Sequence, residues 1–331
     1  MSLLKPLRFS VLSYFRFPVL PYTSASGKPL LVPYIVLIHN WEHSISKVHI
    51  LMNKLITGGT RLLGIVGDPV RQARAPEVWT SLFRLNGIDA VCVPMHVSPA
   101  GFQSFVNGMK TMHNLIGMIV TVPHKPAAAS LVHHLSERAR VIGAANVLRW
   151  NADGELAGDI TDGVGFVRGM RACGNDFKGK RVLIVGSGGV GTAIALAVAG
   201  TGCAEIGVSD TSRERAQTLC NRINSAGTAS HIAVAAAQGF DLVINATPVG
   251  MRPDDPLPID CDGLSPATVV ADVIMDPLMT KLLTAAKERG CAIHQGTHMM
   301  DHSIHEMAQF FGLEGNDWGV EAVARAVTPL R

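Results

Sequence analysis

The chain has 331 residues, of which 47% are hydrophobic and 17% are charged, and its 29 basic and 26 acidic side chains give a formal net charge of +3. This length indicates two domains, and a balanced charge without a long basic run argues against a nucleic-acid partner. The six cysteines are widely spaced without a C-x-x-C pair, which indicates neither a zinc site nor a disulfide framework and favours a reducing cytoplasm.

Residues 1–56 differ in composition from the rest of the chain. Four basic residues precede the first acid, Glu42, and prolines and aromatic residues interrupt every helical pattern. The apolar stretch 30–38 is too short to span a bilayer, so no membrane association is expected. The acid-poor start fits a targeting segment, but a start codon assigned too early, with the protein beginning near Met52, explains it more simply.

Residues 57–160 are predicted to form a β/α domain, because short apolar runs alternate with helical patterns. We expect strands at 61–66, 90–95 and 115–120, and helices at 76–86, 99–111 and 126–139. Lys125 follows the third strand and precedes Pro126, which places it in a strand-to-helix loop. An ordinary solvated lysine is the alternative interpretation.

Residues 161–297 are predicted to form a dinucleotide-binding domain, followed by C-terminal helices in 298–331 that return to the cleft. We expect strands at 181–185, 205–208, 241–245, 268–273 and 291–294, and helices at 163–172, 190–200, 211–226, 279–289, 298–311 and 317–327. Asp162 stands where the first of these helices begins. A lysine and a carboxylate that face each other in a cleft can relay the proton of a hydroxyl as hydride moves to or from a nicotinamide.

A G-x-G-x-x-G sequence lies between an apolar strand and a helix-forming run, as a dinucleotide site requires. It consists of Gly186, Ser187, Gly188, Gly189, Val190 and Gly191. The first glycine permits the tight turn, the second lets a pyrophosphate approach the backbone, and the third allows close packing of helix and strand. The helix N-terminus supplies free N–H groups for the anion. A glycine turn kept for packing alone is the alternative.

Asp210 ends the next predicted strand, where a carboxylate meets the adenosine ribose of a dinucleotide. An acceptor there pairs with the 2′-hydroxyl of NAD and repels the 2′-phosphate of NADP. Because Asp210 also precedes a helical pattern, it can equally cap that helix. The cofactor is therefore expected to be NAD rather than NADP.

Several motifs in order resemble the shikimate dehydrogenase family, over roughly Arg61 to Gly312. They are Gly67-Asp68-Pro69, Val120-Thr121-Val122-Pro123-His124-Lys125, Gly143-Ala144-Ala145-Asn146, Thr161-Asp162-Gly163, the glycine loop, Asn245-Ala246-Thr247-Pro248, Asp272-Val273-Ile274-Met275-Asp276-Pro277 and Gly296-Thr297-His298-Met299-Met300. The resemblance implies an α/β fold with an N-terminal substrate domain and a C-terminal Rossmann-type domain. It also implies a cytoplasmic NAD(P)-dependent enzyme of aromatic amino acid biosynthesis that reversibly oxidises a secondary ring hydroxyl of a shikimate- or quinate-like acid. A homodimer is possible, but the sequence identifies no interface.

The same resemblance assigns roles to individual residues. Lys125 and Asp162 would be the catalytic pair, and Thr121 and Asn146 would contact ring hydroxyls of the substrate. The nicotinamide would lie near three further residues, Thr247, Met275 and Gly296. Thr247 could equally be a turn residue and Asn146 a loop residue that bonds backbone, since both residue types often do so.

The chain departs from the family at the substrate carboxylate. The family's H-S-x-S-P reads Gln72-Ala73-Arg74-Ala75-Pro76 here, so both hydroxyls are absent. Arg71 and Arg74 flank the lost hydroxyls and could hold a carboxylate instead, because guanidinium binds carboxylate in a bidentate manner. Solvated surface arginines are the alternative. Ser303, where the family has a late glutamine, is a further candidate for substrate binding.

These departures leave two alternatives open. The first is a related enzyme that acts on a different hydroxy acid and is inactive on shikimate; the second is a regulatory protein that binds NAD without turnover. His298, His302 and His305 have helical spacing, and His298 and His302 could touch the substrate. Since no acid or cysteine at fixed spacing completes a zinc pattern, no metal is predicted.

Overall fold

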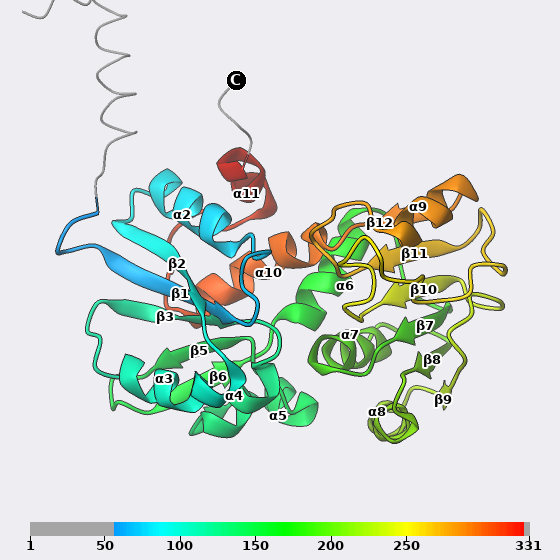
Figure 1. The fold of residues 1–331 in the computed structure, drawn as a ribbon, viewed down its shortest axis with the longest axis horizontal. Coiled ribbons are helices and arrows are strands. Elements are labelled where there is room, and N and C mark those ends of the chain that lie inside the picture. Colours follow the sequence, from blue (N-terminus) through cyan, green and yellow to red (C-terminus); the bar gives the residue numbers. More distant parts are fainter. Residues whose placement is uncertain (1–55, 328–331) are drawn as a thin grey trace, which may run out of the picture. The chain divides into compact units, whose positions relative to one another are not determined.

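The structure is a computed structural model that describes residues 56–327, and these residues carry two six-stranded sheets (Figure 1). The first sheet comprises β1 (Arg61–Gly67), β2 (Ala90–His96), β3 (Leu115–Val120), β4 (His134–Leu135), β5 (Val147–Trp150) and β6 (Leu156–Asp159), in the order β2-β1-β3-β5-β6-β4. β1 pairs in parallel with β2 and β3, whereas β5 is antiparallel to β3 and to β6. The strands β3 and β6 therefore run in the same direction, and their carboxyl ends lie at the same edge of the sheet.

Four helices and one 3-10 turn accompany the first sheet. They are α2 (Ala75–Leu85), the 3-10 turn η1 (Pro99–Gly101), α3 (Phe102–Met109), α4 (Lys125–Leu131) and α5 (Glu137–Ile142). In α2 the buried residues Val78, Trp79, Leu82 and Phe83 recur at helical spacing and pack against β1 in one core cluster. Pro76 lies in the first turn of α2, where its fixed φ suits the helix start.

The predicted helix at 126–139 is wrong. The chain leaves α4 at Val132, whose backbone is extended, and the N–H of His133 donates to Leu156 O. The short strand β4 then pairs with β6, and Ser136 caps the new helix α5 by accepting from Ala139 N. Pairing with a strand distant in sequence thus overrides the local helical pattern. The strands β4, β5, β6 and β9 (Ser230–Ile232) were not predicted either.

The second sheet is entirely parallel and has Rossmann order. Its strands are β7 (Arg181–Val185), β8 (Glu205–Ser209), β9, β10 (Leu242–Asn245), β11 (Val269–Asp272) and β12 (Ala292–His294), arranged as β12-β11-β10-β7-β8-β9. Its helices are α6 (Asp162–Ala172), α7 (Gly189–Ala199), α8 (Arg213–Ser225) and α9 (Lys281–Glu288). The strand order reverses between β7 and β10, which is where doubly wound sheets bind dinucleotides. The fold is therefore α/β, with a substrate domain followed by a Rossmann-type domain.

The last two helices pack on earlier parts of the chain. Helix α10 (Thr297–Phe310) lies along α6, so closely that a Cβ at Gly165 would come within 1.9 Å of Ser303 Oγ. Helix α11 (Val320–Val327) packs against α2, and Trp318 before it joins the aromatic core with a ring centroid 5.5 Å from that of Trp79. No helix among residues 56–327 has the length and apolar character to cross a membrane. The expected extension at 1–56 lies, except for Ile56, outside the described residues.

Candidate active site

A buried lysine and a buried aspartate meet at the carboxyl edge of the first sheet. Lys125 begins α4 shortly after β3 ends, and Asp162 begins α6 shortly after β6 ends. Because these two strands point the same way, the two helix starts are brought together. Lys125 Nζ donates to Asp162 Oδ2 over 2.6 Å, and the two residues are only 8% and 6% exposed. The structure thus places in direct contact the two residues that the sequence predicts as a pair.

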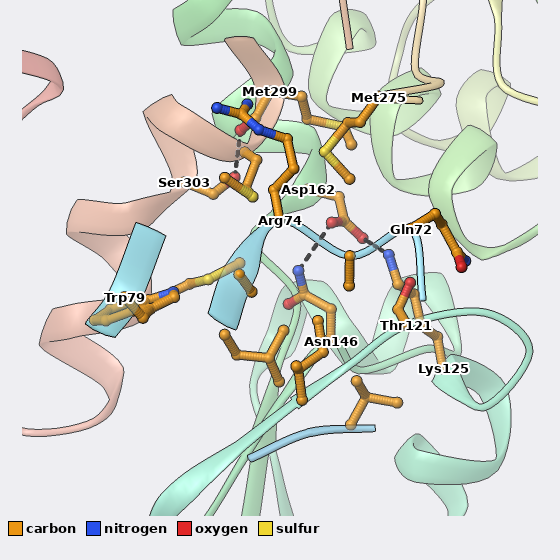
Figure 2. Close-up of a pocket in the computed structure, with 17 residues that line it drawn as sticks. Gln72, Arg74, Trp79, Thr121, Lys125, Asn146, Asp162, Met275, Met299 and Ser303 are labelled. Carbon is orange, nitrogen blue, oxygen red and sulfur yellow. Dashed lines mark hydrogen bonds and ion pairs between the residues drawn. The ribbon is translucent and has the colours of Figure 1, made fainter. Parts of the chain in front are cut away.

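Asn146 completes this buried network (Figure 2). It directly precedes β5, which runs opposite to β3 and β6 and so starts at the edge where they end. Its Nδ2 donates to Asp162 Oδ1 over 2.9 Å and to Thr161 Oγ1 over 3.1 Å, while its Oδ1 accepts from Thr161 N over 2.9 Å. With each oxygen of Asp162 accepting from a buried donor, the orientation of the carboxylate is fixed.

The loop before Lys125 is anchored by His124, a residue for which the sequence indicates no role. Its ring stacks on Phe102 at a centroid distance of 4.4 Å, and its Nε2 lies 2.7 Å from Val97 O. The imidazole is 2% exposed, so it belongs to the packing that holds α4 in place. This contact supports the position of Lys125 without adding a group to the pocket.

The network opens into a pocket that both domains line (Figure 2). Its polar lining residues are Gln72, Arg74, Thr121, Lys125, Asn146, Asp162 and Ser303. The apolar lining includes Ile65, Ile119 and Trp79 from the first domain, and Met275, Met299, Met300 and Met307 from the second domain and α10. A small apolar pocket with polar groups converging at one end is typical of a ligand site.

Arg74 lies in this pocket with part of its guanidinium unpaired. Its Nη1 is 3.8 Å from Asp301 Oδ1, and neither atom is exposed or has a hydrogen-bond partner within 56–327. Burial raises the pKa of the Asp301 carboxyl, an effect that Arg74 and His298 partly offset. Arg71, in contrast, is exposed and is not among the residues that line the pocket. Of these two arginines, which are three positions apart in the sequence, only Arg74 therefore lies in the pocket.

Trp79 is a pocket residue that the sequence analysis missed. Its side chain is fully buried, and its Nε1 has no hydrogen-bond partner among the described residues. A buried tryptophan N–H usually has an acceptor. Helical spacing alone predicts Trp79 as a core residue, and no sequence signal shows that its ring also lines a pocket.

Ser303 lines the pocket but its hydroxyl is already bonded. Its Oγ donates to Met299 O, one turn earlier in α10, over 2.7 Å, and lies 3.4 Å from Thr161 O. The residue is 1% exposed and packs against Gly165 of α6. Its small size lets the two helices approach, which is a structural reason for serine at this position.

The glycine loop has the geometry of a dinucleotide cradle. Gly186 has a φ of +99°, which side chains with a Cβ rarely adopt, and a Cβ at Gly191 would lie 1.9 Å from Gly186 O. Gly188 is different, because a Cβ built there meets nothing within 4 Å. The loop is tight where helix and strand pack and open where a pyrophosphate would approach the start of α7. The residues of the glycine loop therefore fit the pyrophosphate of a dinucleotide.

The glycine loop also lies next to Lys125. A Cβ built at Gly189 would be 3.7 Å from Lys125 Cβ and 3.5 Å from Ala144 Cβ. Gly189, between Gly188 and Val190, thus lies beside the start of α4. The predicted cofactor site and the predicted proton-transfer site are therefore neighbours.

Asp210 follows β8 and binds the glycine loop and the start of α8. Its Oδ2 accepts from Ser187 N over 2.8 Å and from Ser187 Oγ over 2.6 Å, and its Oδ1 accepts from Ser212 N over 2.8 Å and from Arg215 Nη2 over 2.7 Å. Burial alone would raise the pKa of Asp210, but these hydrogen bonds outweigh it and hold the pKa below its ordinary range. The carboxylate is ionised at neutral pH.

The three residues expected near the nicotinamide have different surroundings. Met275 lines the pocket. Thr247 forms a turn, since its Oγ1 donates to Asn245 Oδ1 over 2.7 Å and accepts from Val249 N over 3.1 Å. At Gly296 a Cβ would come within 2.4 Å of Val273 O, so glycine is required by backbone packing just before α10.

Comparison with known proteins identifies the family of this chain. A model described as the shikimate dehydrogenase substrate binding domain matches residues 65–148, and one described as shikimate/quinate 5-dehydrogenase matches residues 170–250. Shikimate dehydrogenase (NADP(+)) of Rubrobacter xylanophilus is 34% identical over 279 residues, which cover 82% of this chain and 97% of that protein.

Two solved structures show the same architecture. Shikimate 5-dehydrogenase from Listeria monocytogenes, in complex with shikimate and NAD, has 29% identity and a TM-score of 0.71, covering 83% of this chain and 99% of that chain. The ligand-free 5-ketofructose reductase of a Gluconobacter species has 29% identity and a TM-score of 0.69, covering 81% of this chain and 97% of that chain.

Proposed function

This chain belongs to the shikimate dehydrogenase family of NAD(P)-dependent oxidoreductases, and from this premise we propose that it reversibly oxidises a secondary ring hydroxyl of a shikimate- or quinate-like cyclic hydroxy acid. The observation that carries the proposal is the buried Lys125–Asp162 pair, which lies beside the dinucleotide loop and at the end of an apolar pocket. No other arrangement of acid and base lines this pocket in the described part of the chain.

Lys125 transfers the proton in this proposal. The glycine loop would hold the pyrophosphate of a dinucleotide, whose nicotinamide would supply the hydride acceptor. In the oxidative direction a neutral Lys125 amine takes the hydroxyl proton, and in the reductive direction the Lys125 ammonium returns a proton to the developing alkoxide. Asp162 accepts one N–H of Lys125, which turns the remaining lone pair or N–H groups toward the pocket and balances the charge of the ammonium form.

Asn146 and Thr121 position the ring in this proposal. Asn146 holds Asp162 and lines the pocket, and Thr121 lines it directly after β3. Hydroxyl groups of the substrate would meet these polar groups at one end, while the methionines cover the apolar faces of the ring. A site built this way rejects a substrate that leaves its buried polar groups unpaired.

Arg74 is proposed to hold the substrate carboxylate in place of the two serines of the family. Its buried Nη1 has no hydrogen-bond partner within 56–327. A substrate carboxylate would be such a partner, and a buried donor that gains an acceptor recovers part of the free energy lost on burial. Arg71 is exposed outside the pocket and serves as the matched control.

NAD is the proposed cofactor rather than NADP. Asp210 remains negatively charged because its pKa lies below the ordinary range, so it repels a 2′-phosphate. Arg215 is bonded to the same carboxylate, which partly neutralises that repulsion. The Rubrobacter relative carries NADP(+) in its name, and the Listeria structure contains NAD, so the family accommodates both.

Two alternatives remain, and the same experiment separates them. The first is a related enzyme that acts on a different hydroxy acid and is inactive on shikimate; the likeness to a 5-ketofructose reductase supports a change of substrate within this fold. A regulatory protein that binds NAD without turnover is opposed by the buried Lys125–Asp162 pair. Formation of reduced dinucleotide is measured with shikimate, quinate and other cyclic hydroxy acids, and with open-chain polyols. Turnover on shikimate or quinate supports the proposal, turnover only on other compounds supports the first alternative, and binding without any turnover supports the second.

A cytoplasmic location and a homodimer are proposed with this function. Six free thiols are compatible with a reducing compartment. Sedimentation of the purified chain tests the dimer, and the location of a tagged full-length chain tests the compartment.

A further inference from the structure

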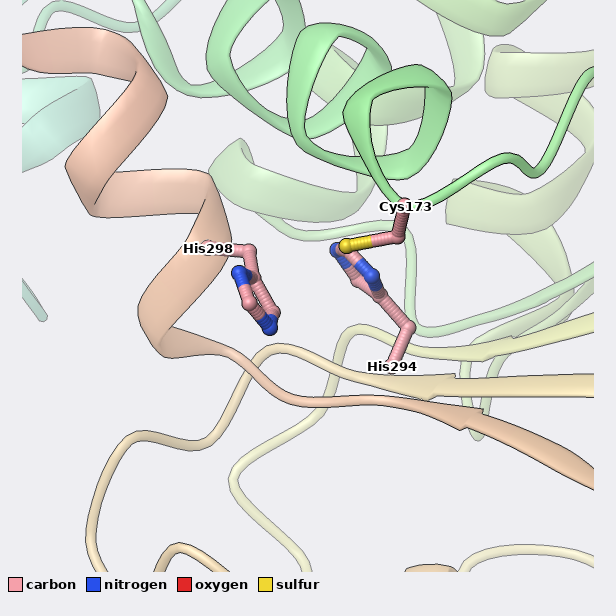
Figure 3. A group of neighbouring side chains, drawn as sticks. All are labelled: Cys173, His294 and His298. Atoms are coloured by element: carbon pink, nitrogen blue, oxygen red, sulfur yellow. The ribbon is translucent and has the colours of Figure 1, made fainter. Parts of the chain in front are cut away.

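Three side chains that can bind a metal gather where the ends of α6, β12 and α10 meet (Figure 3). Cys173 follows the last residue of α6, His294 ends β12, and His298 is the second residue of α10. One possible ligand atom from each lies within 4.8 Å of the other two. None of the three residues lines the substrate pocket.

His294 is buried in a way that its protein neighbours do not explain. The residue is 1% exposed, and neither Nδ1 nor Nε2 has a hydrogen-bond partner in the described part of the chain. A neutral imidazole has one donor and one acceptor, and burying both unpaired is unfavourable. The ring stacks on His298 at 4.7 Å and meets the edge of Phe166 at 5.8 Å, contacts that fix its plane but satisfy neither nitrogen.

The ring nitrogens of His294 are free to bind a metal. Neither nitrogen of this buried ring is engaged by a hydrogen bond within the described residues, so the imidazole has a lone pair to offer an ion. All six cysteines lie among the described residues, and of these only Cys173 is exposed. An ion can therefore reach the thiol from solvent and meet the imidazoles behind it.

We propose that Cys173, His294 and His298 bind Zn²⁺. One thiolate and two imidazoles are typical zinc ligands, and three protein ligands leave a fourth position for water. A tetrahedral ion would bring the ligand atoms to about 3.3–3.6 Å from one another. Cys173 is exposed and His298 is half-buried, so rotation of these two side chains would bring their ligand atoms to this spacing around the buried His294.

A second group of possible ligands differs in kind. His134, Asp153 and Glu155 are all exposed, and His134 Nε2 already bonds Glu155. These residues need no ion to satisfy their polar atoms, so they carry no proposal. They offer a control, because an ion bound there would not involve a thiolate.

Zinc in this site would tie together two helices that also form the substrate pocket. Helix α6 begins with Asp162, and α10 carries Met299 and Ser303. The helices already touch near the site, since a Cβ at Gly169 would lie 3.1 Å from His298 O. Eleven residues of α6 separate the site from the catalytic end by about 16 Å. The ion therefore acts on the stability of the helix pair and takes no part in the reaction.

The test uses the reduced, metal-free full-length chain and Co²⁺ as a spectroscopic substitute for Zn²⁺. The proposal predicts one bound Co²⁺ per chain, an absorption band from thiolate-to-cobalt charge transfer, and loss of this band when Zn²⁺ displaces the Co²⁺. Zn²⁺ should also protect Cys173 from alkylation and raise the Tm. These readouts do not depend on activity, so they are independent of the proposed substrate.

Variants locate the ion. Cys173→Ser should abolish the charge-transfer band, and His298→Asn should weaken Zn²⁺ binding at least about tenfold. His134→Asn and His305→Asn should leave both unchanged. Because His294→Asn could unfold the chain, the exposed Cys173 decides the matter. No thiolate band in the parent chain, or a band and affinity unchanged in Cys173→Ser, would overturn the proposal.

Discussion

Asp210 Oδ2 lies 2.8 Å from the backbone nitrogen of Ser187, so the acid after β8 is bonded directly to the glycine loop. Together with the bonds from Ser212 and Arg215, this contact keeps the carboxylate charged at the place where the adenosine ribose is expected. The same side chain thus fixes the glycine loop and carries the proposed preference for NAD.

Asp210→Ala is expected to shift the cofactor preference toward NADP. The ratio of kcat/KM for NAD to that for NADP should fall at least about tenfold, because removing the carboxylate removes its repulsion of the 2′-phosphate and frees Arg215. Glu214→Ala changes the net charge equally at an exposed position of α8 and should leave the ratio nearly unchanged. Strong preference of the parent enzyme for NADP would show that Asp210 does not select NAD.

Arg74→Ala is expected to raise the KM for the acid substrate by about 10- to 100-fold, since a charge-assisted hydrogen bond contributes about 1.5–3 kcal/mol. The dinucleotide KM should stay the same. Arg71→Ala removes the same charge outside the pocket and should change neither value. The parent enzyme should also prefer the free acid to its methyl ester, a preference that Arg74→Ala loses. Equal effects of the two arginine variants would refute this role.

Two glycines of the loop are expected to behave in opposite ways. Gly191→Ala places a Cβ 1.9 Å from Gly186 O, so it should lower the Tm by several degrees and impair dinucleotide binding. Gly188→Ala meets no atom within 4 Å and has an ordinary φ of −70°, so the Tm should hardly change. Its new methyl group should nevertheless weaken dinucleotide binding at least about tenfold, because the pyrophosphate approaches the backbone there. Calorimetry and fluorescence titration measure the two effects.

Asp272 is expected to make stability depend on pH. Burial raises its pKa from 3.8 to about 6, although Ile274, Thr280 and Asn245 donate to it. Because the pKa is higher in the folded state, protonation favours folding below pH 4, and this stabilisation is lost as pH rises through 6. The loss is at most about 3 kcal/mol for a shift of two units.

Asp272→Asn tests this dependence, because an amide has no charge to lose. Between pH 4.5 and 7 the free energy of unfolding of the parent enzyme, measured in urea, should fall relative to that of Asp272→Asn. Parallel curves for the two proteins would mean that Asp272 has an ordinary pKa in the folded state.

Much of the fold could be predicted from local sequence patterns, because the strands of the second sheet other than β9 are short apolar runs and the glycine loop stands between one of them and a helix-forming run. Lys125 could be identified because it lies between a predicted strand and Pro126 at a helix start, and Asp162 because it stands where a predicted helix begins; both also lie in motifs of the family. The end of helix α4 at Val132 could not be predicted, since it depends on the pairing of His133 with Leu156 across the first sheet. Local pattern carries no information on such partners.

The rest of the site depends on contacts between distant residues. Arg71 and Arg74 look equivalent in sequence, and only the position of α2 places Arg74 near Asp301 of α10. Trp79 has the helical spacing of a core residue, and its ring does belong to the aromatic core, so its spacing does not reveal that it also lines the pocket. The histidine spacing in α10 groups His298 with His302 and His305, whereas the structure places His298 with residues from β12 and the end of α6.

The most direct test of the account is the turnover of Lys125→Met and Lys125→Arg with the best substrate of the parent enzyme. Methionine keeps the length of the side chain without a transferable proton, and arginine keeps the charge near Asp162 but does not lose its proton at neutral pH. Both variants should lose at least about 100-fold in kcat, while Lys125→Arg keeps the parent dinucleotide Kd and near-UV circular dichroism. Near-normal turnover of either variant would contradict the assignment of proton transfer to Lys125.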